Sequence, residues 1–222
     1  MIRAEAVNRT FGSGAAPVHA CRDISLAVEP GELLVVRGPS GSGKTTLLNL
    51  LGGLDRPDSG QIWVGDQELT GMREAAITAV RRDRIGYVFQ TFGLIPILSA
   101  AENVEIPLRI KGTEPAERER RVAEMLELVG LADHARQRPY ELSGGQQQRV
   151  GVARALVSEP DILLADEPTG QLDSRTAAVM MDLIAQLVRS RQIAAVVSTH
   201  DPLLMDRADR VMQLHDGRLS PA

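Results

Sequence analysis

The chain has 222 residues, of which 43% are hydrophobic and 24% are charged, so we expect one packed domain without extensive disorder. Its 25 basic and 29 acidic side chains give a net charge of −4, which argues against a general grip on nucleic acid and against a polybasic membrane anchor. The single cysteine, Cys21, excludes an intrachain disulfide and a zinc site built from several cysteines.

Apolar runs are short along the whole chain. The longest, such as residues 33–36 and 193–197, have the length of strands and fall far below the ~20 residues of a membrane helix. The first residues also lack the basic and then apolar pattern of a secretory signal. We therefore expect a cytoplasmic protein that does not itself span a bilayer.

The first half of the chain is predicted to begin with β-structure. Up to residue 36, short β-rich runs alternate with turn signals, and residues 33–36 are typical of a buried strand. A helix-like run covers residues 46–51, a strand is expected over residues 61–64, and a further apolar run covers residues 85–89.

An amphipathic helix is predicted in the middle of the chain, over residues 115–129. Four apolar side chains recur there at the spacing of one helix face, namely Val122, Met125, Leu126 and Val129. The charged stretch at residues 117–121 is expected to be its solvated face.

The second half alternates between helices and strands. We expect helices over residues 144–157 and 174–189, strands over residues 162–165, 193–198 and 211–214, and a short helix after Pro202. Such alternation favours right-handed crossovers and a parallel sheet. The predicted fold class is therefore α/β, with an antiparallel β part from the N-terminal region and a helical insertion around residues 91–140.

A phosphate-binding loop is predicted at residues 38–45, where Gly-Pro-Ser-Gly-Ser-Gly-Lys-Thr fits the pattern G-x-x-x-x-G-K-[ST] between a strand and a helix. Its glycines allow backbone N–H groups to surround a phosphate chain, while Lys44 reaches the β and γ oxygens and the Thr45 hydroxyl binds Mg²⁺. The alternative is an incidental turn, but a chance match is expected in about one chain in a hundred. Lys44 is also one of only two lysines in the chain.

Two carboxylates, Asp166 and Glu167, follow the apolar strand at residues 162–165. The carboxyl ends of parallel strands border the ligand crevice, so both acids should lie beside the phosphates. Asp166 suits an indirect hold on Mg²⁺, and Glu167 suits polarising the attacking water. Taken alone, one of them could simply cap the turn before Pro168.

A second anion-binding helix start is predicted at Ser143, Gly144, Gly145 and Gln146. Ser143 is placed as the N-cap, and the two glycines leave the following N–H groups accessible. A plain capping sequence is the alternative for this segment.

His200 and Gln90 are further candidates because each follows an apolar run that is predicted to be a strand. A lone histidine is more often structural, but at a strand end His200 could donate to a γ-phosphate and hold the attacking water in line. Gln90 could reach Mg²⁺ or water. The remaining histidines have no such setting and are expected in loops or on the surface: His19, His134 and His215.

Together these motifs resemble the ATP-binding subunit of ATP-binding-cassette (ABC) transporters, over residues 2 to about 219. The corresponding family motifs are Walker A at residues 38–45, the Q-loop at Gln90, the signature at residues 142–146, Walker B at residues 162–166 with Glu167 after it, the D-loop at Asp173 and the switch histidine at His200. The resemblance implies a P-loop NTPase fold with one ABC ATPase domain over residues 1–222. Its nucleotide-binding core is expected at about 1–90 and 160–222, and its helical subdomain with the signature at about 91–159.

The resemblance also assigns roles to individual residues. The implied catalytic residues are Glu167, His200, Lys44 and Gln90. The implied Mg²⁺ ligands are Thr45, Gln90 and Asp166. The implied ATP-binding set is Phe11, Gly38, Pro39, Ser40, Gly41, Ser42, Gly43, Lys44, Thr45, Thr46, Ser143, Gly144, Gly145, Gln146 and Asp173. Phe11 would stack on adenine where the family usually has tyrosine, although a phenylalanine there could equally belong to the core.

In this family two subunits sandwich two ATP molecules, with Walker A of one facing the signature of the other, so a second copy of the chain is an expected partner. Residues 53–60, 92–96 and 167–170 resemble the branch that contains the macrolide-export and lipoprotein-release ATPases. The resemblance implies contact with a membrane permease through the region of residues 90–98, at the cytoplasmic face of the membrane. Gln171 departs from the asparagine usual in that branch.

The sequence therefore predicts Mg²⁺-dependent ATP hydrolysis in a head-to-tail homodimer that drives a separate permease in export, lipoprotein release or mechanotransmission. One alternative is a soluble ABC ATPase of DNA repair, although the chain lacks the space and cysteines for the coiled coils or zinc modules usual there, and no nucleic acid partner is expected. Another is a cell-division type of switch with little turnover. The presence of both Glu167 and His200 favours an enzyme that turns over ATP.

Overall fold

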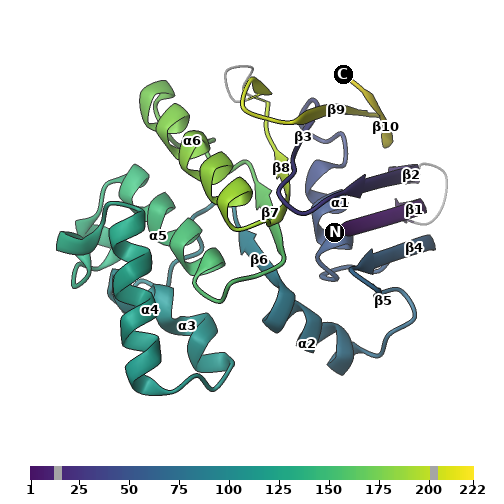
Figure 1. Ribbon diagram of the computed structural model, residues 1–222. Coiled ribbons are helices and arrows are strands. Elements are labelled where there is room, and N and C mark those ends of the chain that lie inside the picture. Colours follow the sequence, from purple (N-terminus) through teal and green to yellow (C-terminus); the bar gives the residue numbers. More distant parts are fainter. Residues whose placement is uncertain (13–16, 201–204) are drawn as a thin grey trace.

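The computed structural model describes residues 1–12, 17–200 and 205–222, which form two β-sheets and the helices around them (Figure 1). The smaller sheet is antiparallel and has the strand order β2-β1-β4-β5. Its strands are β1 (Ile2–Phe11), β2 (Val18–Val28), β4 (Ser59–Val64) and β5 (Gln67–Glu68). The predicted antiparallel part from the N-terminal region is therefore confirmed.

The larger sheet has the strand order β10-β9-β3-β8-β7-β6, and all of its neighbouring pairs are parallel except β10 with β9. Its strands are β3 (Leu33–Arg37), β6 (Ile85–Val88), β7 (Ile162–Asp166), β8 (Ala194–Ser198), β9 (Arg210–His215) and β10 (Arg218–Pro221). The predicted α/β class with a parallel sheet is confirmed. The hairpin to β10 was not predicted, although its two-residue Asp216-Gly217 turn has positive φ at both positions and a typical hairpin sequence.

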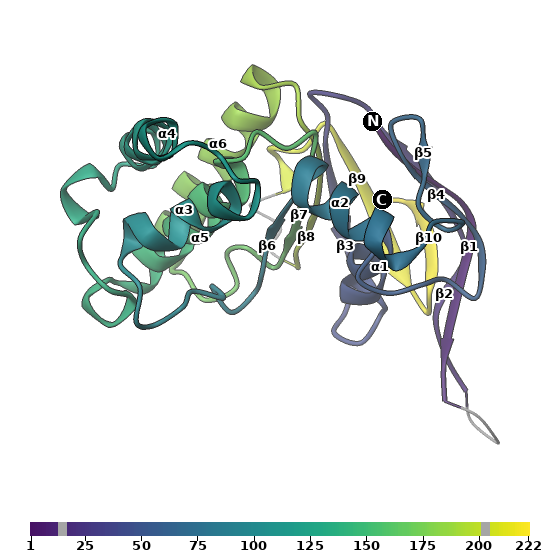
Figure 2. The ribbon, with the colours of Figure 1, turned by 90° about the horizontal axis from the view of Figure 1, so that it is seen from below.

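Side chains alternate between the two faces of the parallel sheet. In β3, Leu34 and Val36 pack toward the antiparallel sheet, whereas Leu33 and Val35 pack toward the helices of the other face. Both faces are covered, which explains the uninterrupted apolar runs of these strands. Helix α1 (Lys44–Leu51) lies between the two sheets (Figure 2).

The other helices surround the parallel sheet on its remaining sides: α2 (Glu74–Arg84), α3 (Ala100–Ile110), α4 (Pro115–Leu128), α5 (Gly144–Leu156) and α6 (Ser174–Ser190), with 3₁₀ turns η1 (Ala132–His134) and η2 (Pro139–Glu141). Helices α3, α4 and α5 gather at one end of the molecule (Figure 1). Helix α4 buries Val122, Met125 and Leu126, as its periodicity predicts. The short helix expected after Pro202 falls outside the described residues.

The order of the strands decides where the polar motifs meet. The carboxyl ends of β3, β8, β7 and β6 are neighbours in the parallel sheet, and each of the four strands is followed by a predicted motif. Among the residues that the structure describes, no helix is both long and apolar enough to cross a membrane.

Candidate functional site

The loop at residues 38–43 connects β3 to α1 and depends on glycine at two positions. A Cβ atom on Gly43, whose φ is 105°, would lie 2.1 Å from the Ala20 carbonyl oxygen, and one on Gly38 would lie 2.2 Å from the Leu214 carbonyl oxygen. No other residue fits at either place without moving the backbone. Lys44 begins the helix and folds back over the loop, donating to the carbonyl oxygens of Gly38 at 2.9 Å and Pro39 at 3.1 Å.

The loop has unused hydrogen-bonding capacity that suits a phosphate chain. Gly43 is the N-cap of α1 and provides no side-chain cap, so the first N–H groups and the positive end of the helix dipole are available at the cavity that Gly43, Lys44 and Thr45 line. The Ser42 hydroxyl is buried and has no hydrogen-bond partner within the described part of the chain. A buried polar atom of this kind is costly unless a ligand satisfies it.

Beside the loop, oxygen atoms of three side chains form a chain of hydrogen bonds. The Thr45 hydroxyl donates to Asp166 Oδ2 at 2.8 Å, and the Ser198 hydroxyl donates to Asp166 Oδ1 at 2.6 Å. Hydroxyl and carboxylate oxygens are the donors that Mg²⁺ prefers. The donor set of Thr45 and Asp166 therefore fits that ion.

Glu167 lies at the centre of the site and is held there by its backbone. Its φ is +47°, an uncommon value for glutamate, and its N–H donates to the carbonyl and hydroxyl oxygens of Ser198 at 3.0 and 3.1 Å. The carboxylate is only 12% exposed. It lies 3.6 Å from Lys44 Nζ through Oε1 and 2.7 Å from His200 Nδ1 through Oε2, so it joins the loop to the histidine.

Most of the predicted nucleotide residues line one cavity of about 630 Å³. Its lining includes Phe11, Pro39, Ser40, Gly41, Gly43, Lys44, Thr45, Thr46, Gln90, Asp166, Glu167 and His200. Phe11 is 40% exposed at the edge of this cavity and does not belong to the core. One face of its ring is covered by the Arg9 guanidinium, 4.7 Å from the ring centroid.

The signature residues lie elsewhere, around a second cavity of about 490 Å³. Ser143, Gly144, Gly145, Gln146 and Asp173 all contribute to its lining, and Ser143 is the N-cap of α5, as predicted. The two cavities share no lining residue, so the structure does not bring the signature to the phosphate loop within one chain.

Asp173 caps helix α6 at the edge of the second cavity. Its carboxylate accepts from the Thr176 hydroxyl at 2.7 Å and from the N–H groups of Thr176 and Arg175 at 3.1 Å. These hydrogen bonds, the Thr176 hydroxyl first, hold the pKa of Asp173 below its ordinary value. The D-loop carboxylate is therefore engaged in ordering the start of α6.

Two residues near the site were missed from the sequence. Ser198 links Asp166 to Glu167, and its only sequence signal is a small hydroxyl residue near the end of a predicted strand. His134 was assigned to the surface or a loop, but its ring lies 3.1 Å from the Gln146 side chain of the signature. That contact depends on how η1 packs against α5, which no local pattern indicates.

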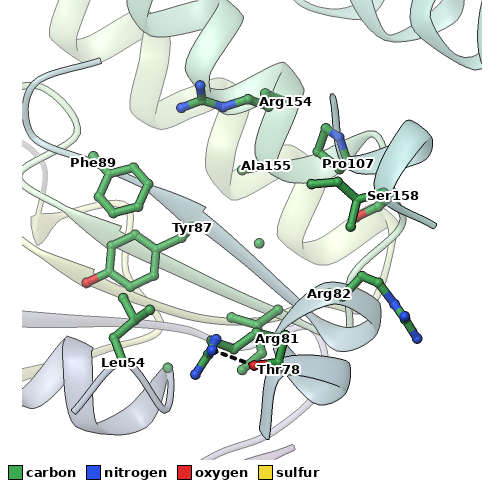
Figure 3. A pocket seen from close by; sticks show the side chains of 14 residues that line it. Leu54, Thr78, Arg81, Arg82, Tyr87, Phe89, Pro107, Arg154, Ala155 and Ser158 are labelled. Atoms are coloured by element: carbon green, nitrogen blue, oxygen red, sulfur yellow. Dashed lines mark hydrogen bonds between the residues drawn. The ribbon is translucent and has the colours of Figure 1, made fainter. Parts of the chain in front are cut away.

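A third cavity, of about 340 Å³, lies where α2, β6, α3 and α5 meet, and we call it the groove (Figure 3). Tyr87 and Phe89 stack with ring centroids 4.6 Å apart, and Leu54 lies beside Tyr87. The exposed side chains of Leu54, Phe89 and Ile110 give the groove apolar walls. Phe89 directly precedes Gln90, so the groove adjoins the phosphate cavity.

Arg154 attaches the groove to the segment after Gln90. Its guanidinium donates to the carbonyl oxygens of Gly93 at 2.6 Å and Phe92 at 3.1 Å, and burial lowers the pKa of this arginine. Ile95 and Ile97, farther along the segment, are 42% and 76% exposed. Both belong to the predicted permease region, and their exposure favours an interface over a core position.

Comparison with known proteins identifies the family to which the chain belongs. The sequence profile described as ABC transporter matches residues 21–170. The chain belongs to the ABC transporter family. This ABC cassette is 49% identical over 91% of its length to the ABC transporter ATP-binding protein YtrE of Bacillus subtilis, covering 87% of that protein. It is 45% identical over 99% of its length to the lipoprotein-releasing system ATP-binding protein LolD of Chromohalobacter salexigens, covering 93% of it.

A longer relative and a solved protein complete the comparison. The cassette is 44% identical over 97% of its length to the macrolide export ATP-binding/permease protein MacB of Rhodopseudomonas palustris, of which it spans only 33%. Its fold matches the dimeric structure of the ABC transporter cassette MJ0796 with a TM-score of 0.91 and 40% identity, covering 100% of this chain and 98% of that one. MJ0796 has also been solved as a post-hydrolysis dimer bound to ADP and Pi, to which this chain is 39% identical. The resemblance inferred from the motifs is thus confirmed.

Proposed function

We propose that this chain is the ATP-hydrolysing subunit of an ABC transporter and that it works as a homodimer with Mg²⁺. The observation that carries the proposal is the contact of Lys44, Glu167 and His200 in the cavity at the phosphate loop. A phosphate-binding lysine, a carboxylate that can polarise water and a histidine that can orient both are the parts that phosphoryl transfer to water requires. The hydrolysis products bound to the relative MJ0796 support the same reaction.

We assign roles to residues that line the cavity and to Ser42, which is buried in the loop beside it. Lys44, the Ser42 hydroxyl and the N–H groups at the start of α1 bind the phosphates, and Phe11 stacks on adenine. Thr45, Asp166 and Gln90 would hold Mg²⁺, and the ion would supply positive charge that offsets the negative charge of the phosphates. Glu167 accepts a hydrogen bond from the attacking water, while His200 holds Glu167 and the γ-phosphate in line. The positive φ of Glu167 fixes the direction of its carboxylate.

A second copy of the chain completes the site, and Gly38 to Thr46 of one copy then face Ser143 to Gln146 of the other. The separation of the two cavities in one chain supports this arrangement, because the start of α5 can then reach a phosphate loop only in another copy. We place Asp173 at the contact between the copies. The division into a core at about 1–90 and 160–222 and a helical part at about 91–159 belongs to the same proposal.

The partner in the membrane is a permease that inserts a helical segment into the groove. Its apolar walls suit such a segment, and the Tyr87–Phe89 stack leads from the groove to Gln90. The names of the relatives LolD and MacB, a lipoprotein-releasing and a macrolide-export system, support a transporter of this kind. The cassette would then lie at the cytoplasmic face of the membrane.

The test is Glu167→Gln, which keeps the shape of the side chain and removes its charge. We expect the variant to bind ATP with Mg²⁺, to lose turnover by at least about a hundredfold, and to accumulate as an ATP-bound dimer. ATPase assays and sedimentation with and without ATP measure these effects. A turnover rate within a few-fold of the unchanged protein would remove Glu167 from its role, and a lack of magnesium-dependent ATP binding would refute the proposal as a whole.

A further inference from the structure

The first turn of α5 is held by hydrogen bonds that extend beyond the signature itself. The Ser143 hydroxyl accepts from the Gln146 N–H at 3.3 Å, and the Ser143 N–H donates to Gln146 Oε1 at 2.8 Å, which completes a capping box. The other end of the same amide, Nε2, lies 3.1 Å from His134 Nε2. His134 Nδ1 in turn lies 2.7 Å from Gln137 Oε1.

Only one assignment of hydrogens satisfies all of these contacts. Because Gln146 Oε1 accepts from the Ser143 backbone, the amide must turn its NH₂ group, which can only donate, toward His134. His134 Nε2 must therefore be the acceptor. The ring then carries its hydrogen on Nδ1 and donates to Gln137, so the network requires a neutral imidazole in one tautomer.

We propose that His134 is a positioning residue that holds the Gln146 side chain, and with it the N–H groups at the start of α5, against the γ-phosphate of the ATP bound by the second copy. The inference rests on the proposed function, because Ser143 to Gln146 act only on a nucleotide bound across the dimer. His134 lines the signature cavity beside these residues. Without it, one of the two atoms that fix the Gln146 amide is lost.

The surroundings of His134 favour this role over simple packing. The ring is only partly buried, so it contributes little apolar contact to the core. The charged side chains that line the same cavity, Arg149 of α5 and Asp173 at the start of α6, are not its hydrogen-bond partners in the described contacts. Both ring nitrogens instead engage neutral amides, which is a geometry that fixes direction.

Two substitutions of similar polarity separate positioning from packing. The terminal amide of glutamine reaches about as far as the Nε2 atom of histidine, whereas the shorter asparagine reaches only the Nδ1 position. His134→Gln therefore keeps an acceptor for Gln146, and His134→Asn does not. His134→Ala removes the ring altogether.

The measurement is ATP-dependent dimerisation of these variants in the Glu167→Gln background, by sedimentation, together with ATP affinity at concentrations where the chain is monomeric. Loss of one neutral hydrogen bond weakens each site about fivefold, and the two sites of a dimer together on the order of 25-fold. We expect that loss for the Asn and Ala variants, a change within about threefold for the Gln variant, and unchanged monomeric ATP affinity in all three.

The outcomes distinguish this inference from the function on which it rests. Failure of Glu167→Gln alone to dimerise with ATP would count against the proposed function. If that background dimerises and the three His134 variants dimerise equally well, the positioning role is overturned while the proposed function stands. A Gln variant as weak as the Ala variant, or a loss of monomeric ATP binding, would also overturn it, because either result indicates a packing role.

Discussion

Ser42 of the phosphate loop carries, at the scale of one residue, a buried hydroxyl that a ligand could satisfy. Its hydroxyl is buried without a partner within the described residues, and a Cβ on the neighbouring Gly38 would lie only 2.8 Å from it. An unsatisfied buried hydroxyl costs about 1–3 kcal/mol. The cost is offset if a phosphate oxygen accepts from the hydroxyl.

We therefore expect Ser42→Ala to change stability and binding in opposite directions. Without nucleotide, the free energy of unfolding should stay the same or rise by about 1 kcal/mol, because an unsatisfied group is removed. ATP affinity should fall about tenfold, because a hydrogen bond to a charged oxygen is lost. Urea unfolding and nucleotide titration measure the two effects. A less stable variant with unchanged ATP affinity would contradict this account of Ser42.

Residues of the phosphate loop could be predicted from the sequence because their spacing is a local requirement. Gly43 and Gly38 are dictated by close approaches of the backbone, and Lys44 by its reach over the loop. Ser198 and His134 could not be predicted in the same way, because their partners are distant in the chain or belong to another element. Tertiary packing creates those contacts, and no local sequence pattern predicts them.

At the scale of elements, Asp209 joins three of them. Its Oδ2 accepts from the Leu33 N–H at the start of β3 at 2.8 Å, and its Oδ1 accepts from Arg189 of α6 at 3.0 Å, while Arg210 begins β9 directly after it. Burial alone would raise the pKa of Asp209. The hydrogen bond from the Leu33 N–H and the charge of Arg189 lower this pKa by more than burial raises it, so the pKa lies below its ordinary value.

The sign of this shift predicts how Asp209→Asn depends on pH. A carboxylate whose pKa is lower in the folded chain stabilises it above the unfolded pKa of about 3.9, and the contribution disappears as pH falls through the folded pKa. The melting temperature of the variant should therefore lie below that of the unchanged protein near pH 6. The difference should close as the pH falls below about 4. Thermal unfolding between about pH 3 and pH 7 measures it, and a difference independent of pH would show that charge is not involved.

Helix α4 was predicted from its own pattern, whereas α2, α3 and strand β10 were not predicted as separate elements. An apolar stripe in the sequence indicates helix α4. Helix α2 buries only Ile77 and Val80, so its sequence shows no comparable stripe. Strand β10 has three exposed residues out of four and is specified mainly by its turn. Local periodicity reports burial, so elements that bury little of their surface leave little signal.

At the scale of the whole molecule, the groove and the predicted permease region adjoin each other. The groove could not be predicted from sequence, because its walls come from helices α2, α3 and α5 packed around one strand. Leu54 and Ile110, which are 49% and 63% exposed, contribute apolar surface to it. Exposed apolar surface of this kind is maintained where a partner covers it.

Ile110→Glu should therefore detach the cassette from its permease without altering its own chemistry. We expect the fraction recovered with membranes to fall at least about fivefold and basal ATPase activity to stay within about twofold, because Ile110 lines the groove and not the phosphate cavity. Val179→Glu is the matched control, since Val179 is 49% exposed on α6 and does not line the groove. Equal membrane recovery of both variants and the unchanged protein would refute the docking role.

The separation of the two cavities has a consequence for mixtures of damaged chains. Lys44→Ala disables the phosphate-loop half of a site, and Ser143→Arg disables the signature half. Either variant alone should therefore lack ATPase activity. When the two variants are mixed, a hybrid dimer has both substitutions in one nucleotide site, and its second nucleotide site is intact. Partial rescue of ATP hydrolysis by combining two dead preparations is therefore expected, and a mixture as inactive as its components would count against a complete site formed between two copies.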